Sequence, residues 1–540
     1  MMMPTTKNDR CPEWGRLPAT GAVLLLMLAA LLAAAVMGCG TSGTSTDASP
    51  SSGGTIQQGG VLRVGAMPGN VNFDPALFAG LTYDILLQQQ IYEKLVNLGQ
   101  DFSVQPMLAT EWDSPDGKVW TFKLQNGVKF SNGEDFTADD VVYTMDRLRS
   151  KELGSPMADV YANVKSIVAT DPTTVTFTLK KVDAEFPASL TDYRALMLCK
   201  SVEDPAKEAV GTGPFVLESI SAEDRAVLKK NPTYWGKDAD GNQLPYLDEI
   251  DFVYSPDPAG MVQGLLGGSI DWLDGLTAEQ KMNVEANPDL KTESTASNFC
   301  FELQIRCDQK PGSDPAVRQA IMAGTDRQAI VDLVAPAGKA APGNGTLVGP
   351  AYVADYLSTS VAYDPEKAKQ LLVDAGYSDG LTIKLVTQNS DPVPAIATAW
   401  QAQMKEIGID VSIQMVPLDV FYAEEGTDNW YQAAFSIVDY GSRAVPNAYF
   451  QLALTSEAPW NYSRWKNAEF DALSQQISTE LDTATRADLY KQAQQILQDQ
   501  VPMMNFMINT TTSGQTANLD GVFLAPDGAQ SLFREAGFTE

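Results

Sequence analysis

Two hydrophobic periods alternate along most of the chain. Apolar and polar residues alternate from Trp120 to Gln125, which predicts a half-buried strand. Apolar residues spaced three or four apart in 138–148, 365–375 and 485–498 predict amphipathic helices. The short apolar run Val61 to Ala66 predicts a buried strand. Because strands and helices mix throughout without repeats, the pattern predicts an α/β fold.

Local turn and cap residues divide this pattern into elements. Asn126-Gly127 predicts a hairpin turn with a strand on either side, and Asp171-Pro172 predicts a second hairpin within 166–179. Thr137 and Asp140 form the sequence of a capping box at a helix start. Further helices are expected over 83–96 and from Pro315 onward. Segments 381–388 and 409–417 are expected as strands around a helix at 394–407, which makes a βαβ unit.

The N-terminal segment has the layout of a bacterial export signal. Three basic residues precede an apolar run from Ala22 to Met37, which is too short for a membrane span of about 20 residues. Val36-Met37-Gly38-Cys39 resembles a lipoprotein processing box, and a Ser/Thr/Gly-rich segment follows it. We therefore predict a signal peptide at 1–38, lipid attachment to Cys39 and a flexible linker over 39–59. An ordinary signal peptide followed by a chance cysteine is the alternative.

Composition excludes several function classes. Lys and Arg number 38 against 68 Asp and Glu, so the net charge of −30 disfavours nucleic acid and anionic lipid surfaces as partners. The chain has no histidine, which excludes Ser-His-Asp catalysis and histidine-based metal sites. Cys300 and Cys307 lie too far apart along one extended strand to form a disulfide unless the strand is broken. Cys199 could pair with either of them, and the sequence does not decide between the two.

A series of motifs resembles the large peptide- and nickel-type solute-binding proteins of ABC importers, extracellular solute-binding protein family 5. The motifs occur in family order from about Val61 to near the C-terminus: "VWTFKLQNGVKFSNGEDFTADDVVYTMDRL", "GTGPFVLES", "LKKNPTYWG", "PYLDEIDF", "DPAVRQAIMAGTDRQAIVDL", "YDPEKAKQLLVDAGY", "NYSRWKNAEFDAL" and "RADLYKQAQQILQDQVPMM". Each is weak alone, and together they are specific.

The resemblance implies a two-lobed periplasmic-binding-protein-like fold with an additional inserted domain. The first domain is then discontinuous, over 60–99, 206–295 and 506–540, the inserted second domain covers 100–205, and the third covers 296–505. Hinge crossings are expected near Ala296 and Asn505. Such a protein is a monomer without cofactor or catalysis. It sits on the outer face of the cell membrane and delivers a small-molecule ligand to ABC permease subunits.

The segment 435–450 is the best candidate for ligand contact. In the family, an aspartate after this strand pairs with the α-amino group of a peptide ligand, and the matching residue is Asp439. Satisfying the turn before Gly441 is the structural alternative for that carboxylate. Arg443 is a candidate for a ligand carboxylate, or else a solvated surface arginine.

Aromatic residues supply further candidates. Peptide receptors tend to have an aromatic residue just before the aspartate, and 436–438 has none, so walls from Trp430, Tyr440, Trp460 or Trp465 are expected instead. For any one tryptophan, core packing is the alternative. Asn70 and Phe73, in the loop after the first strand, are weaker candidates. Phe301, at a hinge crossing, is expected in the core.

These observations favour a lipid-anchored receptor for a short peptide. A β-oligosaccharide receptor of the same family is the first alternative, and nickel is disfavoured because the chain lacks histidine. A secreted glycoside hydrolase using paired carboxylates is the alternative from another class, although no spacing singles out a pair. A sensory lipoprotein that reports its ligand to a kinase cannot be distinguished from a transport receptor by sequence.

Overall fold

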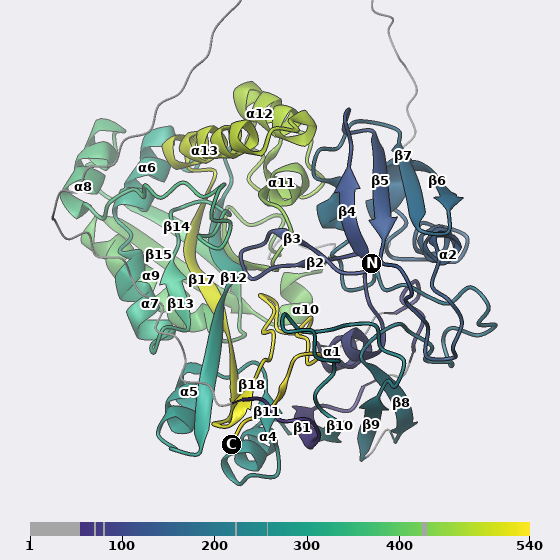
Figure 1. The fold of residues 1–540 in the computed structure, drawn as a ribbon. Coiled ribbons are helices and arrows are strands. Elements are labelled where there is room, and N and C mark those ends of the chain that lie inside the picture. The colour runs from purple at the N-terminus through teal and green to yellow at the C-terminus, as the bar shows by residue number, and fades with distance from the viewer. Residues whose placement is uncertain (1–54, 70–71, 79–81, 222–223, 256, 424–428) are drawn as a thin grey trace, which may run out of the picture. The chain divides into compact units, whose positions relative to one another are not determined.

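A computed structural model describes residues 55–540 except 70–71, 79–81, 222–223, 256 and 424–428 (Figure 1). The predicted signal peptide, Cys39, most of the linker and Asn70 lie outside the described residues. The described residues, from Thr55 to the C-terminus, belong to one compact unit. Among the helices of the described part, none combines the length and apolar character needed to cross a membrane.

The main element is an 11-stranded mixed sheet. Its strands, in spatial order, are β15 (Ile409–Val416), β14 (Leu381–Gln388), β16 (Phe435–Tyr440), β12 (Leu290–Ile305), β17 (Met503–Thr516), β11 (Trp272–Leu273), β1 (Val61–Ala66), β10 (Glu249–Tyr254), β9 (Arg225–Lys230) and β8 (Phe215–Ile220), with β13 (Ala340–Pro342) paired to β17. β14 and β15 are parallel and flank α9 (Val393–Glu406), which confirms the predicted βαβ unit.

Two long antiparallel strands, β12 and β17, join the two halves of this sheet (Figure 1). Their register runs from Leu290 opposite Thr516 to Gln304 opposite Met503, with irregularities between Ala296 and Cys300 and at Phe301/Glu302. β12 also pairs with β16, which carries the main candidate residues. The hinge positions and the domain boundaries drawn from the sequence stay predictions.

A separate four-stranded sheet has the order β4 (Ala109–Asp113), β5 (Val119–Leu124), β7 (Thr174–Leu179), β6 (Val164–Asp171). The predicted β6–β7 hairpin is confirmed. The hairpin predicted around Asn126-Gly127 is wrong, because both edges of β5 are occupied by β4 and β7. Between β5 and α2, the described chain has an isolated bridge between Lys129 and Asp135 in place of the second hairpin strand.

Acidic side chains bond to the backbone at the start of several predicted helices. Asp140 accepts a hydrogen bond from the Thr137 backbone N–H at 2.9 Å, which confirms the capping box before α2 (Ala138–Leu148). Asp364 accepts from the Lys367 N–H at 2.9 Å at the start of α8 (Pro365–Asp374). The helical region from Pro315 is two helices, α6 (Pro315–Ala323) and α7 (Arg327–Val334). The helix expected over 83–96 ends earlier, at Ile91.

The other elements are shorter or lie nearer the C-terminus. They are α1 (Thr82–Ile91), β2 (Val96–Leu98), β3 (Val104–Pro106), a 3₁₀ turn (Val160–Asn163), α3 (Phe186–Ser189), α4 (Pro258–Leu266), α5 (Ala278–Glu285), α10 (Leu418–Phe421), α11 (Pro446–Tyr449), a π-helical turn (Phe450–Leu454), α12 (Ala468–Thr479), α13 (Thr483–Gln500), β18 (Leu519–Asp520) and β19 (Gly537–Phe538). α13 confirms the last predicted helix.

Separate hydrophobic clusters cover the two faces of the β12–β16 region. Phe301, Leu303 and Ile437 face one cluster with α6, α7 and α9. Cys300 and Tyr440 face another, together with α11, α12 and α13. Phe301 is 5% exposed, so its predicted core position is confirmed. The thiols of Cys199, Cys300 and Cys307 are all free in the described part of the chain.

Candidate functional site

Asp439 lies at the end of β16 and is held by two neutral donors. Its Oδ1 accepts hydrogen bonds from Gln388 Nε2 at 2.7 Å and from the Tyr422 hydroxyl at 2.5 Å. The residue is half-buried, beside β12 on one edge of its strand and near the end of β14 on the other. Neutral donors fix the carboxylate without neutralising its charge, so the charge remains available to a cationic group.

Six aromatic residues pack into an aromatic cluster beside this carboxylate. Trp430 is at its centre, with ring centroids 4.1 Å from Tyr462, 6.0 Å from Tyr422 and 6.4 Å from Trp460. The cluster consists of Tyr422, Trp430, Tyr431, Tyr440, Trp460 and Tyr462. The Tyr440 hydroxyl donates to the Tyr462 hydroxyl at 3.0 Å.

Three tyrosines of the cluster, Tyr422, Tyr440 and Tyr462, are neutral hydrogen-bonding groups. Burial, with the nearby charge of Asp439, raises the pKa of Tyr422 above its ordinary value. Burial also raises the pKa values of Tyr440 and Tyr462, and the charge of Glu302 adds to both. These phenols therefore stay protonated at neutral pH and present donors and ring faces rather than charges.

Arg443 lies near the same cluster. Its backbone N–H donates to the Tyr449 hydroxyl at 3.0 Å, and its carbonyl accepts from the Tyr352 hydroxyl. Its positive charge partly offsets the rise that burial causes in the pKa of Tyr440. Among the described residues, its guanidinium makes no ion pair or hydrogen bond. The structure thus places a cation beside the aromatic cluster.

The other predicted residues fall in different surroundings. Trp430, Tyr440 and Trp460 belong to the aromatic cluster, whereas Trp465 is 4% exposed and packs against Phe470 with centroids 5.2 Å apart. Phe73 is 3% exposed within the core around β1 and β10. The contact of these residues with a ligand stays a prediction.

Sequence reasoning missed one acidic residue of this region. Glu302 lies on β12 opposite Val438, the residue before Asp439, and is 2% exposed. Burial raises its pKa to about 8. The alternation in "CFELQIRC" indicates a strand with a polar face, and the structure covers that face as well. A strand pattern carries no information on what packs against its polar side.

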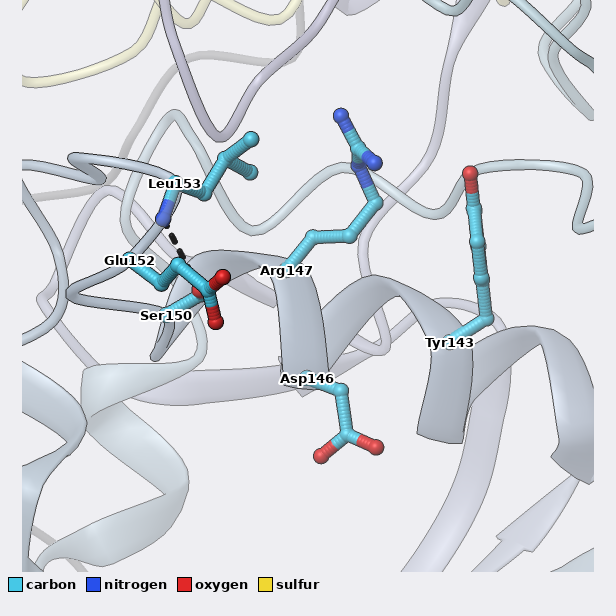
Figure 2. A pocket seen from close by; sticks show the side chains of 6 residues that line it. All are labelled: Tyr143, Asp146, Arg147, Ser150, Glu152 and Leu153. Carbon is cyan, nitrogen blue, oxygen red and sulfur yellow. Dashed lines mark hydrogen bonds between the residues drawn. The ribbon is translucent and has the colours of Figure 1, made fainter.

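A hollow of about 440 Å³ lies at the C-terminal end of α2, and none of its lining residues is on β16. Its lining residues are Tyr143, Asp146, Arg147, Ser150, Glu152 and Leu153. Figure 2 shows Arg147 and Tyr143 pointing to the same side of the helix and Asp146 pointing away from them. Arg147 forms an ion pair with the buried Asp74, so its charge serves the fold. The residues predicted to bind ligand are elsewhere.

Comparison with known proteins identifies the family. A family model described as bacterial extracellular solute-binding proteins, family 5, middle region, matches residues 103–462, which include Asp439 and the aromatic cluster. The chain belongs to this family. The glutathione-binding protein GsiB of Salmonella typhi is 28% identical over 467 residues, covering 81% of this chain and 87% of that protein.

Solved structures of family 5 proteins share the fold. The murein tripeptide-binding protein MppA, in an unliganded open form, matches with a TM-score of 0.80 at 22% identity, over 90% of this chain and 99% of that one. DppA of Helicobacter pylori, in complex with the peptide STSA, matches with a TM-score of 0.67 at 26% identity, over 90% and 99% of the two chains. The expected two-lobed α/β fold of periplasmic binding proteins is confirmed.

Membership in family 5 settles the class of activity. Its members bind solutes outside the cytoplasm as components of ABC importers and are not enzymes. The glycoside hydrolase alternative is therefore removed, and the non-catalytic prediction is confirmed. What family 5 shares is capture of a small ligand.

Proposed function

We propose that this protein captures short peptides by their free α-amino group, with Asp439 as the pairing carboxylate, and delivers them to an ABC permease. The observation that carries the proposal is the Asp439 carboxylate itself, fixed by Gln388 and Tyr422 and paired with no cation among the described residues. A partly desolvated ammonium requires such a carboxylate. The aromatic cluster beside it offers ring faces and phenol hydroxyls to the rest of the ligand.

Relatives support a peptide ligand. The relatives at 28% identity are named for binding glutathione, which is a tripeptide, and the DppA structure at 26% identity contains a peptide. Arg443, with its unpaired guanidinium near the cluster, suits the carboxylate end of a short peptide.

The location follows from the N-terminal sequence. We propose that the first 38 residues are removed on export and that the protein is held to the outer face of the membrane by lipid on Cys39. It acts as a monomer at its permease. The Ser/Thr/Gly-rich residues before position 60 then form the tether between lipid and receptor.

Substitution of Asp439 by asparagine tests the proposal. Asp439→Asn keeps the oxygen that accepts from Gln388 and Tyr422 but removes the charge. We expect the affinity for Ala-Ala-Ala to fall at least about 30-fold, because loss of one partner from a buried charged pair costs about 2–5 kcal/mol. Isothermal titration calorimetry measures this directly.

The matched control is Asp419→Asn. Asp419 is an exposed residue on α10, so this substitution should leave the affinity for Ala-Ala-Ala unchanged. N-acetyl-Ala-Ala-Ala should bind the natural protein as weakly as the free peptide binds Asp439→Asn. Equal affinity of both peptides for the natural protein contradicts the proposal. Binding of cellotriose in place of either peptide supports the oligosaccharide alternative.

A further inference from the structure

A patch of buried polar side chains lies on β12 and β17 next to the proposed peptide site. Glu302, Gln304 and Asn505 are 2%, 5% and 0% exposed. Glu302 is directly opposite Asn505 in the strand register, so both side chains leave the sheet on the same face. Gln304 follows Glu302 by two residues and shares that face.

Most polar atoms of this patch have no hydrogen-bond partner within the described part of the chain. Gln304 Nε2 donates to Glu302 Oε1 at 2.9 Å. Glu302 Oε2, Gln304 Oε1 and both amide atoms of Asn505 are buried and unpartnered. A buried unpartnered polar group costs about 1–3 kcal/mol, so three such side chains side by side need an explanation beyond the fold.

The patch is within electrostatic reach of the Asp439 site. After burial itself, the charges of Glu302 and Asp439 are the causes that raise the pKa of the Cys300 thiol. The charge of Glu302 also raises the pKa values of Tyr422, Tyr440 and Tyr462, all members of the aromatic cluster. Glu302 therefore lies near three tyrosines of the aromatic cluster, and in the strand register Asp439 is opposite Phe301, the residue before Glu302.

We propose that Glu302, Gln304 and Asn505 form a second subsite that binds the cationic side chain of a lysine- or arginine-containing peptide. This inference rests on the proposed peptide function and names the class of peptide preferred. The unpartnered atoms are three oxygen acceptors and one amide donor. An ammonium or guanidinium group supplies only donors, three or five of them, and so matches the three acceptors. The tyrosine rings next to the patch are favourable neighbours for a cation.

Binding at this subsite is linked to ionisation of Glu302. Its carboxyl holds a proton up to about pH 8 in the ligand-free protein because burial raises its pKa. A cation binds the ionised form, so the affinity for a basic peptide should rise with pH towards about 8, and that for a neutral peptide should not. The titratable groups that the charge of Glu302 reaches are Cys300, Tyr422, Tyr440 and Tyr462, and the charges of Asp439 and Arg443 act on members of the same group.

The experiment compares Ala-Lys-Ala, Ala-Ala-Ala and Ala-Glu-Ala by calorimetry at about pH 6 and about pH 8.5. We expect the natural protein to bind Ala-Lys-Ala about 10-fold or more tightly than Ala-Ala-Ala at the higher pH, with a smaller preference at the lower pH. Glu302→Gln, which keeps the size of the side chain, should lose the preference and its pH dependence while binding Ala-Ala-Ala as before.

The matched control is Glu293→Gln. Glu293 is on the same strand but accepts a hydrogen bond from Gln515 and lies outside the patch, so this variant should keep the preference for Ala-Lys-Ala. Thermal unfolding of Glu302→Gln checks that it folds. Two results overturn the subsite proposal: Ala-Lys-Ala binds no better than Ala-Ala-Ala, or Glu302→Gln keeps the preference for Ala-Lys-Ala. If Asp439→Asn still weakens binding in either case, the peptide function itself stands. Failure of all three peptides to bind the natural protein overturns the peptide function as well.

Discussion

Gly211 and Gly213, in the "GTGPF" motif, lie against the backbone at the C-terminal end of helix α1. A β-carbon on Gly211 would lie 2.0 Å from the carbonyl oxygen of Ile91, and one on Gly213 would lie 2.6 Å from that of Gln90. The Gly213 N–H donates to the Ile91 carbonyl at 2.8 Å. Only glycine permits this approach, which explains the residue type in the motif.

Gly211→Ala should destabilise the protein. A methyl group here forces the two backbones apart, and we expect a loss of about 1–3 kcal/mol, seen as a lower midpoint of thermal unfolding. The control is Gly260→Ala, on the exposed side of α4, where alanine favours the helix and the midpoint should hold or rise. Equal midpoints for Gly211→Ala and the natural protein would disprove the steric explanation.

At this scale the sequence reveals residue types better than their surroundings. The place of Asp439 near the end of a strand could be predicted because a strand pattern is a local property of the chain, whereas its contact with a ligand stays a prediction. The burial of Glu302 could not, because a strand pattern shows two faces without showing what covers them. Trp465 shows the same limit, since the sequence left both a cleft wall and core packing open, and in the structure its ring packs on Phe470.

Among the elements, α3 and α13 are connected through a buried carboxylate. Glu185, just before α3, accepts hydrogen bonds from the Tyr490 hydroxyl of α13 at 2.8 and 2.9 Å and lies 3.6 Å from Arg486. The Ala184 N–H also donates to the Ser478 carbonyl at 2.8 Å. These contacts attach the region of the four-stranded sheet to the C-terminal helices.

Tyr490→Phe tests this connection. Without the phenol hydroxyl the buried carboxyl group of Glu185 loses a hydrogen-bond partner, and we expect stability to fall by about 1–3 kcal/mol at neutral pH. Tyr363→Phe, at a tyrosine that is 42% exposed, is the matched control and should change little. Urea unfolding, monitored by tryptophan fluorescence, measures the stability of both variants. If Tyr490→Phe has the stability of the natural protein, the hydroxyl contributes nothing to it.

Element types were predictable where their causes are local. The aspartate caps of α8 and the capping box of α2 depend on side chains within three residues of the helix start. The hairpin after Gly127 failed for a non-local reason, since β7, which occupies one edge of β5, comes about 50 residues later in the chain. Pairing depends on which strands compete for an edge, and short windows do not contain that information.

For the molecule as a whole, buried acids govern the pH dependence of stability. Burial raises the pKa of Glu185 and of Glu302 to about 8, that of Asp274 to about 7 and that of Asp355 to about 6. Between about pH 4.5 and 8 the native state therefore binds more protons than the unfolded chain, so the free energy of unfolding decreases as pH rises. The net charge of −30 acts in the same direction.

The ligand-free protein should accordingly have a higher unfolding midpoint near pH 5.5 than near pH 8 in scanning calorimetry. Glu185→Gln and Asp274→Asn should each reduce that difference, because the neutral amides do not titrate. Burial lowers the pKa values of Lys94 and Lys339 to about 8, so these lysines oppose the trend only above that pH. A midpoint that rises from pH 5.5 to 8 would contradict this account.

The family could be recognised from the order of its motifs, but the strand order of the large sheet could not. β1 lies between β10 and β11, which follow it by about 190 residues in the chain. Neighbours so distant are chosen by the packing of the whole fold rather than by local sequence.

The continuity of β12 has a mechanical consequence. One end of this strand bonds to β16 beside Asp439 and carries Glu302, and the other end pairs with β17 as far as Thr516. The same backbone is thus both a wall of the proposed peptide site and a link between the halves of the sheet. A twist of β12 relative to β17 would therefore move Glu302 and the β16 residues that β12 holds. Ligand binding and a change in the angle between the two halves of the sheet are then mechanically coupled.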